Sequence, residues 1–369
     1  MKVLQFSKFY PPVHGGIEQV AFDISEGIAK SNGQQVDVLC VDPVGKRKDD
    51  EKHHYSIFRE KIFAQLFSTP LSISLIFKWR KIRNSYDVIH VHLPNPLAVL
   101  ALFLFPPKGK IVLHWHSDIV KQKKLLMFFS PLQKWILERS SHIIVTSPIY
   151  GQSSATLQPY QNKIVCIPIG VDTHIMPLNE DLEQKIRSQY HDKKIVFSLG
   201  RLVYYKGMEY LIEAAKELPD DYVVLIGGTG PLIDSLKQKV SENKLSEKVI
   251  LLGSINYSDL ASYYKACDVF CLPSIHESEA FGVVQLEAMS FSKPLVSTNI
   301  PRSGVAWVNQ HNETGIVVEP NDAKALANGI ISVLNKSDVY SKGAKARFDT
   351  MFTKELMVQN IINLYSSLK

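Results

Sequence analysis

The sequence predicts an α/β protein made of two doubly wound domains. Short runs of β-branched residues alternate with segments of helical periodicity, and this alternation occurs twice along the 369 residues. Most of the runs carry charges only at their ends, which is typical of parallel strands covered on both faces. A Pro/Gly turn, Pro168-Ile-Gly-Val-Asp172, separates the two alternations and is followed by a polar stretch to Asp192.

The individual elements follow from these patterns. In the first half we expect strands at Lys2–Phe6, Val36–Val41, Val88–Val91, Ile111–Trp115, His142–Thr146 and Lys163–Ile167. In the second half we expect strands at Ile195–Gly200, Val223–Gly227, Val249–Leu252, Val269–Leu272, Leu295–Thr298 and Gly315–Val318. Helical periodicity marks Ile17–Lys30, Gly207–Glu217, Pro231–Asn243, Ser258–Ala266 and Val283–Phe291, and Thr353–Leu368 is expected to be a capped amphipathic helix.

These elements divide the chain into domains of residues 1–170 and 171–352, with a final helix in residues 353–369. Two doubly wound domains that face each other would leave a central cleft at the carboxyl ends of their strands, where ligands bind. Charge is uneven, because residues 1–170 carry a net charge of +9 and residues 171–369 carry −3. The basic half could therefore face an anionic partner such as a membrane surface or a phosphate-bearing substrate.

Composition indicates an ordinary globular protein, with 45% hydrophobic and 21% charged residues. The cysteines form no C-x-x-C pair, so buried free thiols in a reducing compartment are favoured over a zinc site. The chain starts with a strand instead of a signal peptide, and its longest apolar run, Leu97–Phe105, is too short to span a bilayer. We therefore expect a cytoplasmic or peripheral protein.

Two loops of the second half carry features suited to phosphate. Arg201 and Lys206 lie between a strand that ends at Gly200 and a helix that begins near Gly207, where two cations suit a diphosphate. The alternative is a pair of solvated loop charges. The segment Ile226-Gly-Gly-Thr-Gly-Pro231 places Gly228 and Gly230 in a similar turn, and it lacks the full G-x-G-x-x-G spacing. Close approach to a ligand and a tight structural turn are equally compatible with it.

A third segment, Pro273 to Glu287, combines a polar loop with the start of a helix at Phe281-Gly-Val-Val. Backbone N–H groups at a helix start are free to meet an anion. Glu279 precedes the helix and Glu287 lies inside it, so the two carboxylates could contact both ends of a folded sugar nucleotide. A solvated helix face is the alternative for Glu287, and its apolar neighbours weaken that alternative.

The first half offers two more candidate segments. Gly15 and Gly16 lead from the first strand loop into a helix and would allow close approach of a phosphate or sugar, or form an ordinary turn. In His114-Trp-His-Ser-Asp118, a histidine and a carboxylate at a strand end could contact a sugar. A metal at the histidines His90, His92, His114 and His116 is disfavoured because no acidic partner set is evident. The sequence also has no D-x-D pair and no G-x-x-x-x-G-K-[ST] loop.

Together these segments resemble the retaining glycosyltransferases of family 4, which have the two-domain GT-B architecture. The resemblance covers nearly the whole chain. Its most specific part is the E-x7-E element in "EAFGVVQLEAM", followed by "GRL…KG", "GTGP", "IPIGVD" and "HGGIE". The chain departs from the family pattern at Ala280, where glycine is common, and at Ile169, where asparagine is usual. Neither change removes a charged group.

The resemblance implies roles for these residues. Arg201 and Lys206 would neutralise the donor diphosphate, Glu287 would hold the ribose hydroxyls, and Glu279 would contact the transferred hexose. His116 would lie by the donor sugar. The implied catalytic residues are thus Glu279, His116, Arg201 and Lys206. The implied donor-binding residues are Gly15, Gly16, Gly200, Arg201, Lys206, Gly228, Gly230, Leu252, Glu279, Phe281, Gly282, Val283 and Glu287.

The resemblance also implies a reaction. A hexosyltransferase of class EC 2.4.1.- would act without metal or other cofactor and retain the anomeric configuration. Residues 1–170 would hold the acceptor, residues 171–352 the donor, and the last helix would cross back to the first domain. Segments such as "LHWHSDIVKQK" and "RSGVAWVN" resemble bacterial O-antigen and capsule enzymes. They favour GDP-mannose as donor over a UDP-hexose or UDP-N-acetylhexosamine.

The implied partners are a polyprenyl-diphosphate-linked glycan acceptor and the inner face of the cytoplasmic membrane, without nucleic acid. The basic, aromatic stretch from Lys121 to Trp135 resembles an interfacial segment, and a helix that merely covers the sheet is the alternative. Three rival functions stand beside transfer: a sugar-nucleotide epimerase, a glycogen-type phosphorylase and a nucleotide-sugar sensor. The sequence shows no lysine context for pyridoxal phosphate, which a phosphorylase would need. A sensor would be expected to have lost Lys206 or Glu279, and both are present.

Overall fold

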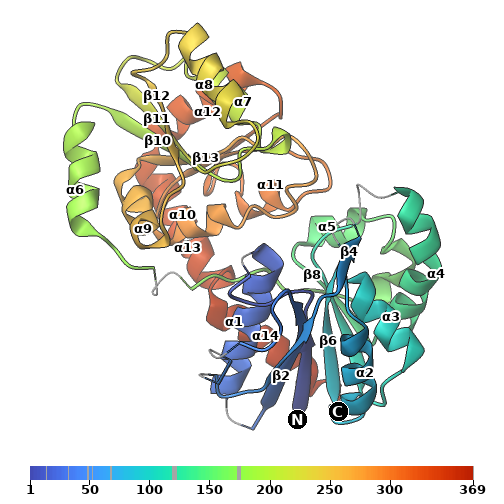
Figure 1. The fold of residues 1–369 in the computed structure, drawn as a ribbon. Helices are drawn as coiled ribbons and strands as arrows, with labels where there is room; N and C mark the ends of the chain where they lie inside the picture. Colours follow the sequence, from blue (N-terminus) through green and yellow to red (C-terminus); the bar gives the residue numbers. More distant parts are fainter. Residues whose placement is uncertain are drawn as a thin grey trace. The chain divides into compact units, whose positions relative to one another are not determined.

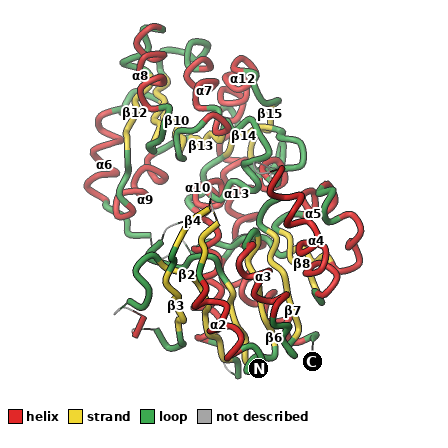
Figure 2. Tube along the Cα trace, turned by 45° about the vertical axis from the view of Figure 1, so that its right-hand side comes forward, coloured by secondary structure: helices red, strands yellow, loops and turns green. Residues whose placement is uncertain are grey.

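The computed structural model describes residues 1–13, 15–31, 33–47, 50–51, 53–66, 69–118, 123–172 and 176–368. The chain forms two compact units, Met1–Ile169 with Lys354–Lys369 and Gly170–Thr353 (Figure 1). Figure 2 shows the yellow strands of each unit lying among red helices. Each unit is an α/β structure around its own parallel sheet.

The first unit contains a seven-stranded parallel sheet in the order β3-β2-β1-β6-β7-β8-β9. Its strands are β1 (Lys2–Phe6), β2 (Gln35–Asp42), β3 (Ile57–Lys61), β6 (Val88–Leu93), β7 (Lys110–Trp115), β8 (His142–Val145) and β9 (Ile164–Cys166). A separate antiparallel hairpin pairs β4 (Ala64–Leu66) with β5 (Thr69–Leu71). Its helices are α1 (Gly16–Lys30), α2 (Ile73–Ile82), α3 (Pro96–Leu104), α4 (Lys123–Arg139), α5 (Pro148–Ser153), the 3-10 helix η2 (Gln158–Lys163) and α14 (Lys354–Ser366).

The two faces of this sheet differ in character. Helices α2, α3 and α4 cover a face built from apolar side chains such as Phe6, Val91 and Leu113. Helices α1 and α14 pack closely against each other, since a Cβ at Gly27 would lie 2.5 Å from Cγ2 of Val358. Helix α14 reaches the opposite face of the sheet, where Tyr365 contacts Gln5 and His90.

The second unit contains a six-stranded parallel sheet in the order β12-β11-β10-β13-β14-β15. Its strands are β10 (Lys194–Leu199), β11 (Tyr222–Gly227), β12 (Val249–Gly253), β13 (Val269–Leu272), β14 (Leu295–Thr298) and β15 (Gly315–Val318). Its helices are α6 (Glu180–Gln189), the 3-10 helix η3 (Tyr204–Lys206), α7 (Met208–Ala214), α8 (Ile233–Glu242), α9 (Tyr257–Ala266), α10 (Val284–Ser290), α11 (Val305–Val308), α12 (Ala323–Leu334) and α13 (Ser337–Met351).

All the strands predicted from the sequence are present, with their ends shifted by at most two residues. Edge strand β3 and the β4–β5 hairpin were not predicted, because their charged and irregular sequences lack the pattern of buried strands. The polar stretch before Asp192 contains helix α6, whose first turn is capped by the Asn179 side chain accepting the Leu182 N–H at 3.0 Å. Among the described helices, none combines the length and the apolar character needed to cross a membrane.

Candidate functional site

The strongest polar feature of the second unit is a buried ion pair between Lys206 and Glu279. Lys206 ends η3, Glu279 lies in the loop before α10, and their exposed fractions are 8% and 9%. Lys206 Nζ lies 2.5 Å from Glu279 Oε2, and the Ser274 hydroxyl donates to the same oxygen at 3.1 Å. Burial of a charge is costly unless the charge is paired, so each of these side chains requires the other.

Glycines allow the loops that carry this pair to meet. Gly207 has φ +63°, and a Cβ there would clash with the carbonyl oxygen of Pro273 at the end of β13. The Ile275 N–H donates to the Tyr205 carbonyl at 2.8 Å across the same contact. A Cβ at Gly200 would lie 3.1 Å from Cε of Lys206. The close backbone approach therefore positions the Lys206 side chain over Gly200.

Arg201 adds a second cation to this region. It is exposed and forms no ion pair with any described residue. Burial raises the pKa of Tyr205, the Glu279 charge acts in the same direction, and the Lys206 and Arg201 charges oppose it. All three charged groups thus act on one phenol, and the exposed Arg201 beside Lys206 offers a cation that could receive an anion.

Glu287 is the second carboxylate of the predicted segment. It lies in the first turn of α10, is partly exposed, and accepts a hydrogen bond from the Tyr264 hydroxyl at 2.5 Å. Burial raises the pKa of Glu287, while the Tyr264 hydrogen bond and the Lys206 charge oppose that shift. Glu287 is therefore held against a packed surface, as its apolar neighbours predicted.

The backbone between the two carboxylates offers hydrogen-bond donors. The N–H groups of Phe281, Gly282 and Val283 make no hydrogen bond within the described part of the chain. The Phe281 ring anchors this loop, with its centroid 6.3 Å from that of Trp307 and 6.2 Å from that of Phe352. Gly282 has φ +72°. The loop can therefore present adjacent N–H groups to an oxygen-rich ligand.

The Gly228-Thr-Gly230 turn has a structural explanation. A Cβ at Gly228, whose φ is +125°, would clash with the Gly200 carbonyl oxygen, and one at Gly230 would clash with that of Leu202. The Leu202 N–H also donates to the Thr229 carbonyl at 2.9 Å. These glycines pack the turn against the loop that carries Arg201. Leu252, near the end of β12, is partly exposed.

Gly15, Gly16 and His116 belong to the first unit. Gly15 precedes α1 in an extended conformation, and no side chain caps the helix. A Cβ at Gly16 would meet no atom within 4 Å, so no described neighbour requires glycine there. His14, the residue before this pair, lies outside the described residues.

His116 follows β7 and is 7% exposed. Its Nε2 lies 3.0 Å from Nδ1 of His92, and burial lowers its pKa to about 3. Its neighbour Asp118 has structural partners, because the Trp115 indole donates to it at 3.0 Å and the Ser154 hydroxyl at 3.1 Å. His116 is thus a neutral ring, and the Asp118 carboxylate accepts hydrogen bonds from two side chains of its own unit.

Sequence reasoning missed the side chains that hold the predicted residues. Ser274 bonds to Glu279, Tyr264 bonds to Glu287, and His92 bonds to His116. The position of Ser274 directly after a buried strand was a usable signal. Tyr264 gave no signal, since its hydroxyl meets Glu287 only through the packing of α9 on α10.

The segment proposed to contact a membrane is only partly described. Lys121 and Gln122 lie outside the described residues, as do the side chains of residues 123–128. Further along α4, the Trp135 ring packs edge-on against Phe103 at a centroid distance of 5.3 Å. Lys134 is exposed and lies 3.8 Å from the Glu138 carboxylate. Trp135 therefore helps to join α4 to α3.

Comparisons with known proteins agree with this architecture. A family model described as Glycosyltransferase Family 4 matches residues 14–175, and one described as Glycosyl transferases group 1 matches residues 179–347. The chain is 33% identical to O-antigen chain mannosyltransferase C of Escherichia coli, over 100% of this chain and 99% of that protein. It is 31% identical to D-rhamnosyltransferase WbpZ of Pseudomonas aeruginosa, over 96% and 92% of the two chains.

Solved structures show the same fold. The structure of Anabaena Alr3699/HepE in complex with UDP matches with a TM-score of 0.81 at 22% identity, covering 100% of both chains. The apo lipopolysaccharide outer core galactosyltransferase WaaB matches with a TM-score of 0.72 at 16% identity, covering 100% of this chain and 99% of that one. The chain has the GT-B fold and belongs to the family 4 glycosyltransferases.

Proposed function

We propose that this enzyme transfers a hexose, with GDP-mannose as the favoured donor, to a polyprenyl-diphosphate-linked glycan in O-antigen or capsule synthesis, with retention of configuration. The two relatives at 33% and 31% identity are named as an O-antigen mannosyltransferase and a D-rhamnosyltransferase. The observation that carries the proposal is the buried Lys206–Glu279 pair with the exposed Arg201 nearby. It supplies both a charge for a leaving diphosphate and a carboxylate for a sugar.

In this proposal, the cations of the second unit stabilise the leaving group. Breaking the anomeric C–O bond develops positive charge on the sugar and negative charge on the diphosphate. Lys206 is fixed by Glu279, so its ammonium group is preorganised for that charge and reorganises little during reaction. Arg201 can form a bidentate contact with a phosphate. The proposed chemistry uses no metal ion.

The carboxylates orient the donor. Glu279 Oε2 is occupied by Lys206 and Ser274, which leaves Oε1 for hydroxyls of the hexose. The N–H groups of Phe281 to Val283 would bond to the same sugar. Glu287 Oε2 is occupied by Tyr264, which leaves Oε1 for a ribose hydroxyl, and the base would lie near Leu252.

The first unit would hold the acceptor. Gly15 and Gly16 would approach the diphosphate or the acceptor, and His116 would contact the donor sugar. The acceptor hydroxyl would attack the anomeric carbon from the face that the diphosphate leaves, and a leaving-phosphate oxygen would take the proton. No protein nucleophile is assigned.

A donor panel tests this function. Purified enzyme is assayed with GDP-mannose, UDP-hexoses and UDP-N-acetylhexosamines, with and without a polyprenyl-diphosphate-linked glycan. We expect acceptor-dependent transfer from GDP-mannose. Preference for a UDP-sugar would overturn the donor assignment, and release of an epimerised sugar without acceptor would instead support an epimerase.

Variants test the residues. Lys206→Ala and Glu279→Ala should each lower transfer more than tenfold, which corresponds to over ~1.4 kcal/mol in the barrier. Lys345→Ala is a matched control, because Lys345 forms an exposed pair with Asp349 at 2.6 Å on α13. Near-normal turnover of either purified site variant would contradict the role proposed for that residue.

We also propose that the enzyme acts as a peripheral protein on the inner face of the cytoplasmic membrane, where such an acceptor lies. Exposed apolar side chains, Ile73 and Phe77, stand beside the basic Arg80 and Lys81 on α2. Apolar and basic groups together suit an anionic bilayer surface. Co-sedimentation with anionic liposomes should be salt-sensitive and weakened by Phe77→Ser, and an absence of binding at low salt would reject docking.

A further inference from the structure

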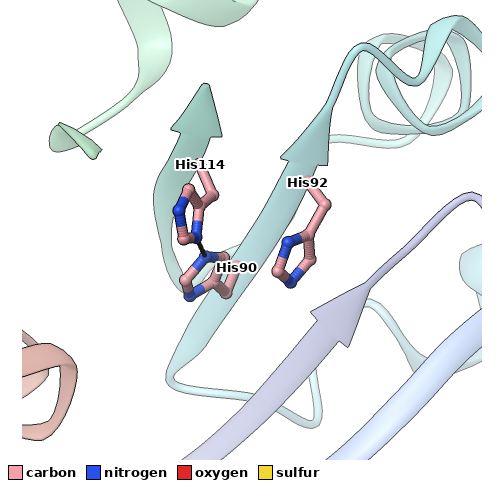
Figure 3. A group of neighbouring side chains, drawn as sticks. All are labelled: His90, His92 and His114. Carbon is pink, nitrogen blue, oxygen red and sulfur yellow. Dashed lines mark hydrogen bonds between the residues drawn. The ribbon is translucent and has the colours of Figure 1, made fainter. Parts of the chain in front are cut away.

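A buried set of polar side chains lies on one face of the first unit's sheet. The register pairs Gln5 with His90 and His92 with His114, so these side chains and His116 share that face. Figure 3 shows His90, His92 and His114 on the adjacent strands β6 and β7. The exposed fractions of His90, His92 and His114 are 0%, 1% and 0%, whereas His116 is 7% exposed.

One hydrogen-bonded chain runs from Gln5 to His116. Gln5 Oε1 lies 2.9 Å from His92 Nε2, and His92 Nδ1 lies 3.0 Å from His116 Nε2. An amide oxygen only accepts, so His92 Nε2 must carry the proton, and its Nδ1 then accepts. His116 Nε2 must therefore donate, which leaves the lone pair on His116 Nδ1. Burial lowers the pKa of both histidines, so both rings are neutral and have one N–H each.

The other end of the Gln5 amide joins a second branch. Gln5 Nε2 donates to the Tyr365 hydroxyl of α14 at 3.1 Å, and that hydroxyl lies 2.5 Å from His90 Nδ1. His90 Nε2 lies 3.3 Å from His114 Nδ1. With Tyr365 accepting from Gln5 and donating to His90, this branch ends at a buried His114 Nε2 that has no partner. The amide group of Gln5 thus controls both branches.

The same histidines are also candidate metal ligands. Nitrogens of His90, His92 and His114 lie within 4.8 Å of one another. The rings of His90 and His92 stack at an interplanar angle of 14°, as do those of His92 and His116. In-plane lone pairs of parallel rings do not converge on one ion, and both nitrogens of His92 are already hydrogen-bonded. The geometry favours a hydrogen-bonded stack.

His116 Nδ1 is the open end of the first chain. It makes no hydrogen bond with a described residue, and it is not among the fully buried side-chain atoms. We propose that Gln5 and His92 are positioning residues that hold His116 with its proton on Nε2, so that Nδ1 accepts a hydroxyl of the donor sugar. The effect on transfer rests on the proposed function, whereas the tautomer can be tested alone.

Nitrogen NMR of the ¹⁵N-histidine-labelled enzyme measures the tautomer, with the His116 signals assigned from their loss in His116→Gln. We expect a protonated Nε2 and an unprotonated Nδ1 in the unsubstituted protein. Gln5→Met removes the accepting oxygen and should mix the two tautomers. Gln5→Glu keeps an acceptor and should restore the original tautomer. Protonation at Nδ1 in the unsubstituted protein, or an unchanged tautomer in Gln5→Met, would overturn the inference.

Kinetics then connect the tautomer to transfer. Gln5→Met should lower kcat about tenfold or more, as expected when an active-site histidine loses its correct tautomer, and Gln5→Glu should recover most of it. Ser25→Ala is a control, because Ser25 is buried in the same unit and its hydroxyl donates to the Ala21 carbonyl. A shifted tautomer with normal kcat would overturn the role of Nδ1. Absence of transfer in the unsubstituted enzyme would contradict the proposed function and leave the tautomer assignment standing.

Discussion

At the residue scale, the candidate site depends on charges that the protein interior holds in pairs. Lys206 and Glu279 are each nine-tenths buried and form their ion pair with each other. A buried pair of this kind contributes little net stability, yet the loss of one partner leaves an uncompensated charge. Activity and folding should therefore respond differently to substitutions here.

Lys206→Met should destabilise the fold by about 3–5 kcal/mol, because it strands the Glu279 carboxylate. Adding Glu279→Gln should recover most of this free energy without restoring transfer. Lys345→Met, at an exposed pair, should cost less than about 1 kcal/mol. Urea unfolding measures all of these values. Equal destabilisation by the single and double variants would show that the pair is not coupled.

Glu287 predicts a pH dependence. Burial raises its pKa and the Tyr264 hydroxyl opposes that shift, so Tyr264→Phe should raise the pKa further. Because ribose binding would use the carboxylate, nucleotide affinity should fall as the pH drops through this pKa. The fall should start at higher pH in Tyr264→Phe. The stability of the folded protein should change in the opposite direction to nucleotide affinity. A carboxyl group whose pKa is raised in the folded state favours that state as the pH falls.

Calorimetric titration with the nucleoside diphosphate across about pH 5 to 8 measures this shift. Tyr263→Phe serves as the control, because Tyr263 stacks on Phe197 at 5.6 Å and makes no bond to Glu287 among the described contacts. Identical pH profiles for the two variants would show that Tyr264 does not tune Glu287.

At the element scale, the loops that follow β10, β11 and β13 are fastened by backbone contacts. Gly207 meets Pro273, and Gly228 meets Gly200, at positions with positive φ. No side chain fits in either contact. The sequence left ligand approach and a structural turn equally open for the Gly228-Thr-Gly230 segment. In the structure, Gly228 and Gly207 pack the loops that present Arg201 and Lys206.

Glycine substitutions separate packing from binding. Gly207→Ala should destabilise the protein by about 1–3 kcal/mol, because it adds a clash to a left-handed conformation. Gly16→Ala should leave stability unchanged or raise it by up to about 1 kcal/mol, since its Cβ meets nothing within 4 Å. If a ligand approaches α1, transfer should nevertheless fall in Gly16→Ala. Thermal unfolding with parallel transfer assays measures both, and full activity would remove Gly16 from the proposed site.

At the scale of the whole molecule, the first and last residues of the chain belong to the same unit. Helix α14 belongs to the first unit, although residues 170–353 separate it from the rest of that unit. Its buried side chains include Val358, Ile361 and Tyr365. Tyr365 also supplies the hydroxyl that accepts a hydrogen bond from the Gln5 amide.

Removal of residues 354–369 should therefore destabilise the first unit selectively. Burial of the apolar face of α14 contributes on the order of 8 kcal/mol, which is comparable to the whole stability of a typical domain. Hydrogen exchange of the truncated protein should show lost protection in β1 and β6 and retained protection in β10 and β11. Unchanged protection of β1 would contradict this role of α14.

The sequence predicted the strands and helices better than the contacts between their side chains. Buried strands such as β10 and β13 were visible because both faces demand apolar residues, whereas edge strand β3, with Arg59 and Glu60, carries no such pattern. The sequence predicted site roles for Lys206 and Glu279 separately. Their mutual contact was not predicted, since it depends on how the β10 and β13 loops meet.

The sequence by itself determined the two alternations of strand and helix, the parallel sheets and the motifs that mark family 4. These features are local, because hydrophobic periodicity and loop motifs depend on residues that are close together in the sequence. Tertiary structure alone decided that Lys206 pairs with Glu279, that the Gly228 turn packs on Gly200, and that Gln5 and Tyr365 control the histidine stack. Those contacts join residues far apart in the chain, and only the packing of strands and helices brings them within hydrogen-bonding distance.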